Sequence, residues 1–518
     1  MSQALERFSI SAPGFYGLNT QDSPLDLAAG FALTATNCIL DKYGRMGARK
    51  GYVNVNTSSG NLGANNVGVI HELVQTDGSV TTLFAGNNKL FKLSGTNVVE
   101  LTYGGGGTAP TITASNWQAA SLNGITYFFQ LSHDPLIYDP AVSTTTFRRV
   151  TEKTGYAGTV PLGNIVCSAY GRLWIANSTT DKTTLTFSDL IAGHIYTGGT
   201  SGTLNVNNVW ANGADEITGL AAHNGFLFIF GKRQILVYSG ATAPSTMTLS
   251  DTVVGIGCQY RDSIQSTNTD VVFLSNSGVR SVLRTIQEKS APFRDLSKNV
   301  RNDLMQLVTG ETPANIKAVY SEVDAFYLLT FPTAGQVYVF DTRSVMQDGS
   351  SRITTWTEIE PTALCALRNG DLLIGKNGYI GKYSGYLDDT ETYRMQYYTN
   401  HADLGDVSIT SIVKSLSIVV IGGSNQVVTF KWGYDFSENY LSDNVSIPTQ
   451  GISEYGVAEY GTNGVPVAQY AGGIVIQTLF SQASGSGKVF QTGYEAEVDG
   501  FELSIQKIEI LAKRGRIS

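Results

Sequence analysis

A strand–turn–strand theme repeats through residues 65–385, and this repeat restricts the fold more than any other feature of the chain. Each unit has an apolar strand, a turn that contains Gly or Asn, and a second apolar strand. Residues 81–95, 225–240 and 370–385 are clear examples, and all three end in Ser-Gly. Short apolar runs bounded by turn residues are typical of β-hairpins, so the sequence predicts a long series of hairpins.

The apolar centres of these units recur at a nearly constant interval. Successive centres are separated by 44, 46, 54, 45, 55 and 45 residues. A period of about 48 residues is typical of one four-stranded blade of a β-propeller. The sequence therefore predicts an all-β chain with a propeller of six or seven blades, in which the first and last repeats could share a blade. The seven centres are Phe84, Phe128, Trp174, Phe228, Phe273, Leu328 and Leu373.

Composition agrees with this fold class. Gly contributes 56 of the 518 residues, and charged residues make up only 15%. Tyr and Phe number 26 and 22, and aromatic side chains suit the half-buried surface of a pleated sheet. Radial closure of a propeller also leaves only short, protected strand edges.

A second β-rich region follows the repeats. Residues 411–421 and 426–436 are strand-like runs separated by Gly-Gly-Ser-Asn, which predicts a hairpin. Residues 501–510 alternate apolar and polar side chains with period 2, as in a half-buried strand. We expect a β-sandwich here, with long loops or a projecting tip at residues 438–500. The expected divisions are an extended segment at 1–60, the propeller at 61–386 and the sandwich at 387–518.

One of the few helices is expected at residues 293–308, which follow a shorter repeat at residues 270–284. Ser297 is the predicted N-cap, because a serine hydroxyl can accept a hydrogen bond from the first turn of a helix.

Charge and cysteine content restrict the partners. The formal net charge is −8 and the isoelectric point is about 5.3, which disfavours tight binding to phosphates. An acidic wall could still line a conduit through which DNA slides without sticking. Four dispersed cysteines without metal-ligand spacing indicate small buried side chains in a protein assembled in a reducing cytoplasm. The sequence shows no apolar stretch long enough for stable membrane insertion.

Candidates for catalysis are weak. None of the five histidines lies in a Gly-x-Ser-x-Gly context, and they are expected to be ordinary strand or turn residues. Two carboxylate pairs stand out, Asp215 with Glu216 and Glu322 with Asp324, and the second pair could face one side of a strand. It falls at a predicted turn, however, where acidic residues are common. We therefore expect no catalytic residues, no metal and no cofactor. The histidines are His71, His133, His194, His223 and His401.

The first fifty residues carry the most distinctive motif, which reads Gly-Leu-Asn, Ser-Pro-x-Asp-Leu, Asn, Asp, Gly and Arg-Lys-Gly-Tyr. With the hairpin series that follows, it resembles the tail hub or nozzle proteins of short-tailed bacteriophages (podoviruses), including tail tubular protein B-like and packaged-DNA stabilisation proteins. The motif residues are Gly17, Leu18, Asn19, Ser23, Pro24, Asp26, Leu27, Asn37, Asp41, Gly44, Arg49, Lys50, Gly51 and Tyr52.

The resemblance implies a structural virion protein without enzymatic activity. It implies a homo-hexamer, assembled in the host cytoplasm, that attaches to the tail adaptor (the head-to-tail connector) below the portal. Tail fibres or spikes would dock on its side, and double-stranded DNA would pass through its channel without sequence preference. The hub would retain packaged DNA before ejection, and residues 1–60 would dock partly on neighbouring tail components. The chain is shorter than the longest relatives, so its nozzle insertions are reduced.

Two surfaces are predicted for such an assembly. Three acidic residues in the distal half, Asp403, Asp406 and Asp435, are expected to line the lumen. Four basic residues near the C-terminus are either a solvated tail or a docking strip for an acidic neighbour. These are Lys507, Lys513, Arg514 and Arg516.

Two alternatives remain open from sequence. A peripheral receptor-binding or fibre-docking propeller would be trimeric and would bind carbohydrate. A tail glycan hydrolase would need an acidic pair in a cleft. The repeats lack the Ser-x-Asp-x-Gly-x-x-Trp turn of many sugar-cleaving propellers, since the nearest match, at residues 275–278, has neither Asp nor Trp.

Overall fold

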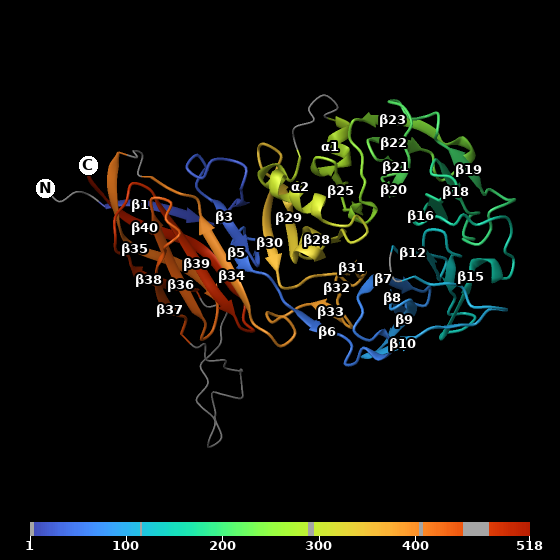
Figure 1. Ribbon diagram of the computed structural model, residues 1–518, viewed down its shortest axis with the longest axis horizontal. Coiled ribbons are helices and arrows are strands. Elements are labelled where there is room, and N and C mark those ends of the chain that lie inside the picture. The colour runs from blue at the N-terminus through green and yellow to red at the C-terminus, as the bar shows by residue number, and fades with distance from the viewer. Residues whose placement is uncertain (1–4, 114–115, 288–294, 404–407, 449–475, 518) are drawn as a thin grey trace, which may run out of the picture. The chain divides into compact units, whose positions relative to one another are not determined.

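The computed structural model describes residues 5–113, 116–287, 295–403, 408–448 and 476–517 (Figure 1). The chain divides into two compact units. The propeller unit comprises residues 54–351 and 360–383, and the sandwich unit comprises residues 1–53, 352–359 and 384–518. Strand β6 (Tyr52–Asn54) carries the chain from the sandwich unit into the propeller unit.

Four sheets of the propeller unit are built on four strands in sequential antiparallel order, and the second of them has a fifth strand. The first holds β7 (Val67–Val74), β8 (Val80–Gly86), β9 (Lys89–Ser94) and β10 (Asn97–Glu100). The second holds β12 (Gln118–Leu122), β13 (Ile125–Phe129), β14 (Leu136–Tyr138) and β15 (Thr146–Arg149), with β11 (Thr102–Tyr103) parallel at its edge. The third holds β16 (Ile165–Ala169), β17 (Arg172–Ala176), β18 (Thr184–Phe187) and β19 (Gly202–Asn205). The fourth holds β20 (Ile217–His223), β21 (Phe226–Gly231), β22 (Gln234–Ser239) and β23 (Thr248–Val254).

Three further sheets complete the unit. The fifth holds β24 (Gln265–Ser266), β25 (Val271–Ser275) and β26 (Gly278–Ser281). The sixth holds β27 (Lys317–Ser321), β28 (Phe326–Phe331) and β29 (Gln336–Val345). The seventh holds β31 (Ala363–Ala366), β32 (Leu372–Gly375) and β33 (Ile380–Tyr383), followed by β6 at its edge.

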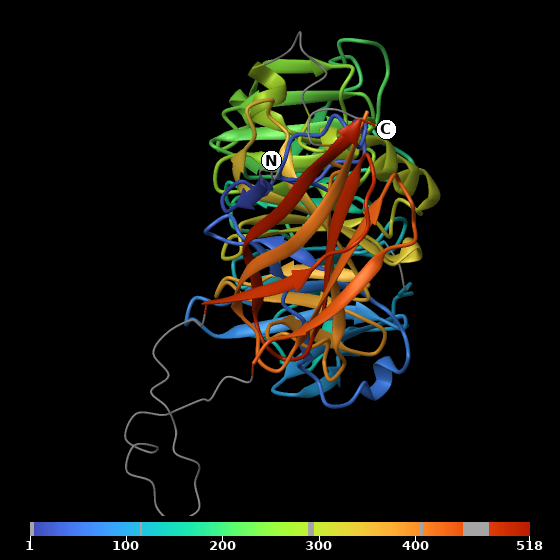
Figure 2. The ribbon, with the colours of Figure 1, turned by 90° about the vertical axis from the view of Figure 1, so that its left-hand side faces the viewer.

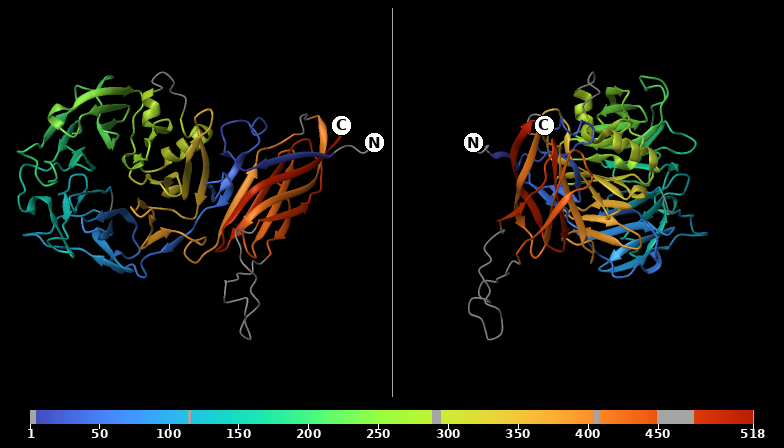
Figure 3. Two further views of the ribbon diagram at one scale, coloured as in Figure 1. Left: turned by 180° about the vertical axis from the view of Figure 1, so that it is seen from behind. Right: turned by 60° about the vertical axis from the view of Figure 1, so that its left-hand side comes forward.

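The first strands of these sheets form a closed ring. Strand β7 contacts β12, and the contacts continue through β16, β20, β24, β27 and β31, which contacts β7 again. Figure 3 shows the sheets radiating from this ring. The propeller prediction is confirmed, and the described residues form seven blades.

Each predicted repeat centre lies on the second strand of its blade. Phe84, Phe128 and Trp174 lie on β8, β13 and β17, and the other four lie on β21, β25, β28 and β32. All seven side chains are buried. Apolar clusters fill the spaces between neighbouring blades, and one of them joins the first blade to the seventh through Phe84 and Leu373. The period reflects one buried strand per blade, because every blade packs against two neighbours.

Residues just after β6 help to close the ring. The Val55 amide donates to the Ile380 carbonyl at 2.8 Å, and the Ile380 amide donates to Asn56 Oδ1 at 2.8 Å. Asn56 is buried, and its amide group also donates to the Gly378 carbonyl at 3.2 Å. The start of the propeller unit is thereby tied to the last blade. The expectation that the first and last repeats share a blade is wrong, because Phe84 and Leu373 lie in separate sheets.

Helices are few among the described residues. The α-helices are α1 (Val282–Gln287) and α2 (Arg301–Gly310). Short 3-10 turns occur at η1 (Gly60–Leu62), η2 (Val150–Glu152), η3 (Pro244–Thr246), η4 (Arg261–Ser263), η5 (Lys298–Val300) and η6 (Pro332–Ala334). A helix near residues 293–308 is confirmed, but the predicted cap is wrong. The Ser297 hydroxyl donates to Asp295 at 3.1 Å and accepts from the Val279 amide at 3.0 Å, so it does not cap the helix.

The sandwich unit has two sheets, and its long strands are seen face-on in Figure 2. The order of the first sheet is β38 (Ile476–Gln482), β35 (Ile409–Gly422), β40 (Leu503–Ile517), β5 (Met46–Ala48) and β4 (Cys38–Leu40), and β1 (Leu5–Ser11) pairs with β40. The part of the second sheet that lies in this unit has the order β30 (Ser351–Thr357), β2 (Gly17–Leu18), β3 (Phe31–Thr36), β34 (Tyr393–Thr399), β39 (Phe490–Val498), β36 (Val427–Tyr434) and β37 (Leu441–Ser446). One buried apolar cluster, which includes Leu416, Phe430 and Ile508, draws on both sheets.

The predicted hairpin at residues 411–436 is wrong. Strand β35 pairs with β38 and β40, whereas β36 pairs with β37 and β39 in the other sheet. Gly422 and Gly423 have φ values of 81° and 76°, so the turn itself is present. Each strand buries one face in the shared core, and pairing across two sheets buries more apolar surface than an isolated hairpin.

The N-terminal and distal regions differ from expectation. Residues 1–60 do not form a separate segment, because β1 and β5 both pair with β40 and β3 pairs with β34. Residues 438–500 are not all loop, since β37, β38 and β39 lie there. Residues 449–475 of the expected tip lie outside the described residues. The units change at 53/54 and 383/384, and residues 352–359 also belong to the sandwich unit.

Candidate functional site

The residues of the N-terminal motif build a buried polar network in the sandwich unit. The guanidinium of Arg49 is fully buried and donates two hydrogen bonds to the Asp388 carboxylate, both at 2.7 Å. It lies 4.0 Å from the ring centroid of Tyr393 and donates to Asn37 Oδ1 at 2.9 Å. Asn37 also donates to the Arg394 carbonyl at 2.9 Å and accepts from the Thr357 amide at 2.9 Å. The bidentate geometry satisfies both ions of the buried pair.

The motif glycines mark close approaches of the backbone. At Gly51 a Cβ atom would lie 1.8 Å from the Leu387 carbonyl oxygen, and at Gly17 it would lie 2.4 Å from that of Ile353. Gly17 has a φ of 79°, which other residues rarely adopt. In this structure these motif residues therefore act as framework, holding distant chain segments together.

The histidines are dispersed, but two of them contact serine hydroxyls on another strand, which the sequence did not reveal. His223 Nδ1 lies 3.3 Å from Ser266 Oγ. His71 Nε2 lies 2.7 Å from Ser121 Oγ, and Ser121 Oγ lies 2.9 Å from Thr126 Oγ1. The two residues occupy β7 and β12 and are 50 residues apart, which is close to the blade period. Burial lowers the pKa of His71 to about 4, so the ring is neutral at pH 7. Among the described residues no carboxylate bonds this ring, so the orienting acid of a catalytic triad is not provided.

The two carboxylate pairs support turns and ion pairs. The Asp215 carboxylate accepts hydrogen bonds from the backbone amides of Lys232 and Arg233, both at 3.0 Å. Burial acts to raise the pKa of Glu216, but Lys232 and Lys182, at 2.9 and 3.1 Å, hold it below the usual value. Glu322 accepts from Asn268 at 2.9 Å. The pairs are therefore occupied by structural contacts.

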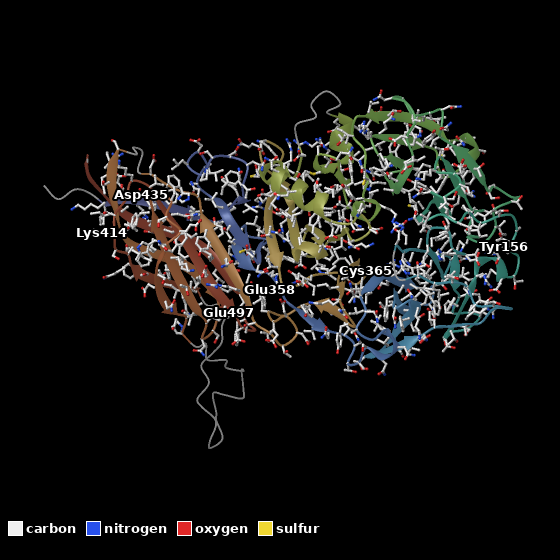
Figure 4. All side chains as sticks on the ribbon, viewed as in Figure 1. Tyr156, Glu358, Cys365, Lys414, Asp435 and Glu497 are labelled. Atoms are coloured by element: carbon white, nitrogen blue, oxygen red, sulfur yellow. The ribbon has the colours of Figure 1, made fainter. Side chains whose placement is uncertain are left out.

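Two of the three predicted lumen residues are described. Asp403 is partly exposed, and Asp435 is exposed at the end of β36 (Figure 4). The Asp435 carboxylate accepts the amides of Lys488 and Val489 at 2.7 and 3.1 Å and so stabilises the approach to β39. Asp406 lies outside the described residues. The lumen role of all three stays a prediction.

The C-terminal basic residues lie on β40 and have acidic neighbours within their own chain. Lys507 pairs with Glu509 at 2.9 Å, and Arg514 lies 3.5 Å from Glu6. Lys513 is in register with Leu5 of β1. The side chain of Arg516 lies outside the described residues. The pairing reduces the charge that this strip offers, and its docking role stays a prediction.

A cavity of about 340 Å³ lies in the channel of the propeller. Strands β7, β12, β24, β27 and β31 contribute to its lining, together with η4. Cys365, which lines the cavity, is labelled on β31 in Figure 4. This cavity is the candidate ligand site of the propeller unit.

In the part of the chain that the structure describes, no group of three or more His, Cys, Asp or Glu side chains could hold a metal ion. The described helices are all too short or too polar to cross a membrane.

No protein-family model and no curated protein sequence matches the chain. Among solved structures, the extracellular domain of the one-component system BT4673 from B. thetaiotaomicron is 10% identical with a TM-score of 0.43. The match covers 88% of this chain and 60% of that one, so the present chain spans about three fifths of its length.

Two smaller propeller domains are also similar. The WD40 domain of Neurospora crassa Pan2 is 11% identical with a TM-score of 0.36, covering 67% of this chain and 98% of that one. The N-terminal domain of Nup159 is 12% identical with a TM-score of 0.36, covering 68% and 97%. None of these three is described as a phage tail protein. The propeller assignment rests on the ring of inner strands and the seven sheets of this chain.

Proposed function

We propose that this chain is a structural subunit of the tail hub or nozzle of a short-tailed phage and has no enzymatic activity. Six copies would form a ring below the adaptor, with DNA passing through its centre. The observation that carries the proposal is the buried network of Arg49, Asn37 and Asp388. Arg49 and Asn37 of this network belong to the N-terminal motif and are held to the later part of the chain through Asp388. The residues that carry the resemblance therefore have a framework role.

Two further observations support a structural role. His71 and His223 contact serine hydroxyls, and the carboxylate pairs described above are engaged in turns or ion pairs. The chain is also charge-poor and rich in Tyr, a composition that suits burial between subunits. A ring needs two different complementary faces on each subunit, and a chain with two units offers separate surfaces for them.

The deciding experiment is the copy number of this chain relative to the portal protein in purified virions, measured by quantitative mass spectrometry. Six copies per portal ring would support the hub. A larger multiple of three would favour a peripheral receptor-binding or fibre-docking propeller. Absence from the virion would overturn the structural proposal.

A further inference from the structure

Two cations and one carboxylate face the propeller channel. Arg261 and Asp262 belong to η4, which precedes the fifth blade, and Lys317 begins β27 of the sixth blade. All three line the cavity of about 340 Å³. Their side chains are only 10%, 16% and 12% exposed. The group therefore has a net charge of +1 in a largely enclosed space.

The guanidinium of Arg261 donates its hydrogen bonds to other groups of the protein. Its Nε donates to Asp262 at 2.7 Å, and its terminal nitrogens donate to the carbonyls of Asn164 and Trp117 at 2.5 and 2.8 Å. Lys317 Nζ donates to the same Asp262 carboxylate. The two cations hold the pKa of Asp262 down at about 2, against the opposing effect of burial, so this carboxylate stays ionised. Because one carboxylate serves two cations, the surplus positive charge resides at Lys317.

Uncharged polar side chains line the same cavity as this ammonium. Gln118 Oε1 accepts a hydrogen bond from the Val166 backbone amide at 2.7 Å. The side-chain NH₂ group of Gln118 can therefore act as a donor. Gln265 and neutral His71 also line the cavity. The inner strands are the terminal strands of their sheets, so their channel-facing backbone edges add further polar groups. A buried positive charge in a cavity lined by hydrogen-bond donors favours an anion over water or an apolar molecule.

We propose that the channel binds a small oxyanion, a carboxylate or phosphate compound that fits about 340 Å³, with its charged oxygen on Lys317. The ligand would touch residues of the first, second, fifth and sixth blades through His71, Gln118, Gln265 and Lys317. Binding therefore links strands that are distant in sequence and stabilises the ring.

The test uses the full-length protein with inorganic phosphate, succinate and chloride at equal ionic strength. Binding is measured by calorimetry, and alkylation of Cys365 is followed by mass spectrometry, with Cys167 as a thiol outside the cavity. We expect phosphate or succinate, but not chloride, to slow Cys365 alkylation at least fivefold while Cys167 is unchanged. Stronger protection of Cys365 by phosphate than by succinate would indicate a phosphate compound as the ligand, and the reverse would indicate a carboxylate. Equal alkylation rates of Cys365 in all three salts would overturn the proposal.

Variants of opposite sign test the assigned charge. Lys317→Gln should weaken binding at least tenfold, whereas Asp262→Asn should strengthen it at least threefold, because the net charge changes in opposite directions. Lys382→Gln is the matched control, since Lys382 pairs with Asp371 at 2.7 Å on an exposed edge. Affinity unchanged in Lys317→Gln would contradict the assignment. If a variant fails to fold, the alkylation experiment on the wild-type protein still decides.

Discussion

Arg49 shows what a single motif residue does in this fold. Its guanidinium is wholly buried, and it reaches Asp388, which lies 339 residues further along the chain. The ring of Tyr393 covers it, and Asn37 fixes its Nε. Such a pair is costly to break, because the remaining ion would be buried without a partner.

We predict that Arg49→Met lowers the free energy of unfolding by about 3 to 5 kcal/mol, since it leaves Asp388 buried and uncompensated. Arg7→Met is the matched control, because Arg7 is 55% exposed and pairs with Glu509 at the surface. The control should cost less than about 1 kcal/mol. Denaturant titration followed by fluorescence measures both, and equal losses would refute the framework role of Arg49.

His71 makes stability depend on pH. Its pKa in the folded chain is about 4, because burial disfavours the charged ring, whereas the ordinary value is 6.5. Between these values the unfolded chain binds a proton that the folded chain does not, so the stability contributed by the neutral ring is lost as pH falls. We expect a loss on the order of 2 to 3 kcal/mol between pH 7 and pH 4. His71→Gln should flatten this part of the curve, and parallel curves for the two proteins would contradict the assignment.

Ser297 illustrates where residue-level reasoning failed. A serine before a helix usually accepts a hydrogen bond from the first turn. Here the hydroxyl bonds Asp295 and the amide of Val279 on β26, and α2 begins four residues later. The Ser297 hydroxyl makes these tertiary hydrogen bonds instead of capping the helix, and the local sequence cannot reveal them.

At the scale of elements, the propeller depends on how its ring is closed. Residues 55 and 56 bond Ile380 and Gly378 of the last blade, and Asn56 is buried. These hydrogen bonds hold the N-terminal end of the propeller unit against its last blade. Loss of the Asn56 side chain would leave the buried Ile380 amide without its acceptor.

We predict that Asn56→Ala costs about 2 to 3 kcal/mol and increases hydrogen exchange in β33 before other blades. Asn61→Ala, at an exposed site where Asn61 bonds Glu100, should change stability by less than about 0.5 kcal/mol. Exchange monitored by mass spectrometry locates the effect. Uniform exchange across all blades would argue against a local closure.

At the scale of the whole molecule, the proposed assembly makes DNA passage depend on acidic residues. The net charge of −8 per chain gives a hexamer a strongly acidic character, and an acidic wall would repel the phosphates. Asp435 is unsuitable for charge reversal, because its carboxylate also holds the Lys488 and Val489 amides. Asp403 and Asp406 are the better positions.

We predict that Asp403→Lys with Asp406→Lys slows DNA ejection from assembled virions several-fold, because lysines would pair transiently with the phosphates. The effect should shrink at higher salt. Asp403→Asn with Asp406→Asn is the matched control and should have a smaller effect. Ejection followed by release of a fluorescent DNA dye gives the rate. An unchanged ejection rate in the lysine variant would contradict the assignment of these residues to the lumen.

The sequence by itself determined the blade pattern. Each blade buries one apolar strand between two neighbours, so its centre recurs along the chain at a period near 48 residues. All seven centres lie on the second strands. Local patterning also indicated the sandwich, because strands with one buried face alternate with period 2.

Only the tertiary structure decided which distant residues meet. The pairing of Arg49 with Asp388, the contact of His71 with Ser121 and the separation of β35 from β36 into two sheets all depend on long-range packing. So does the surplus charge at Lys317, which arises where η4 and β27 face the same channel. Local propensity and periodicity carry no information on such contacts, since these depend on strand register and burial across the whole fold.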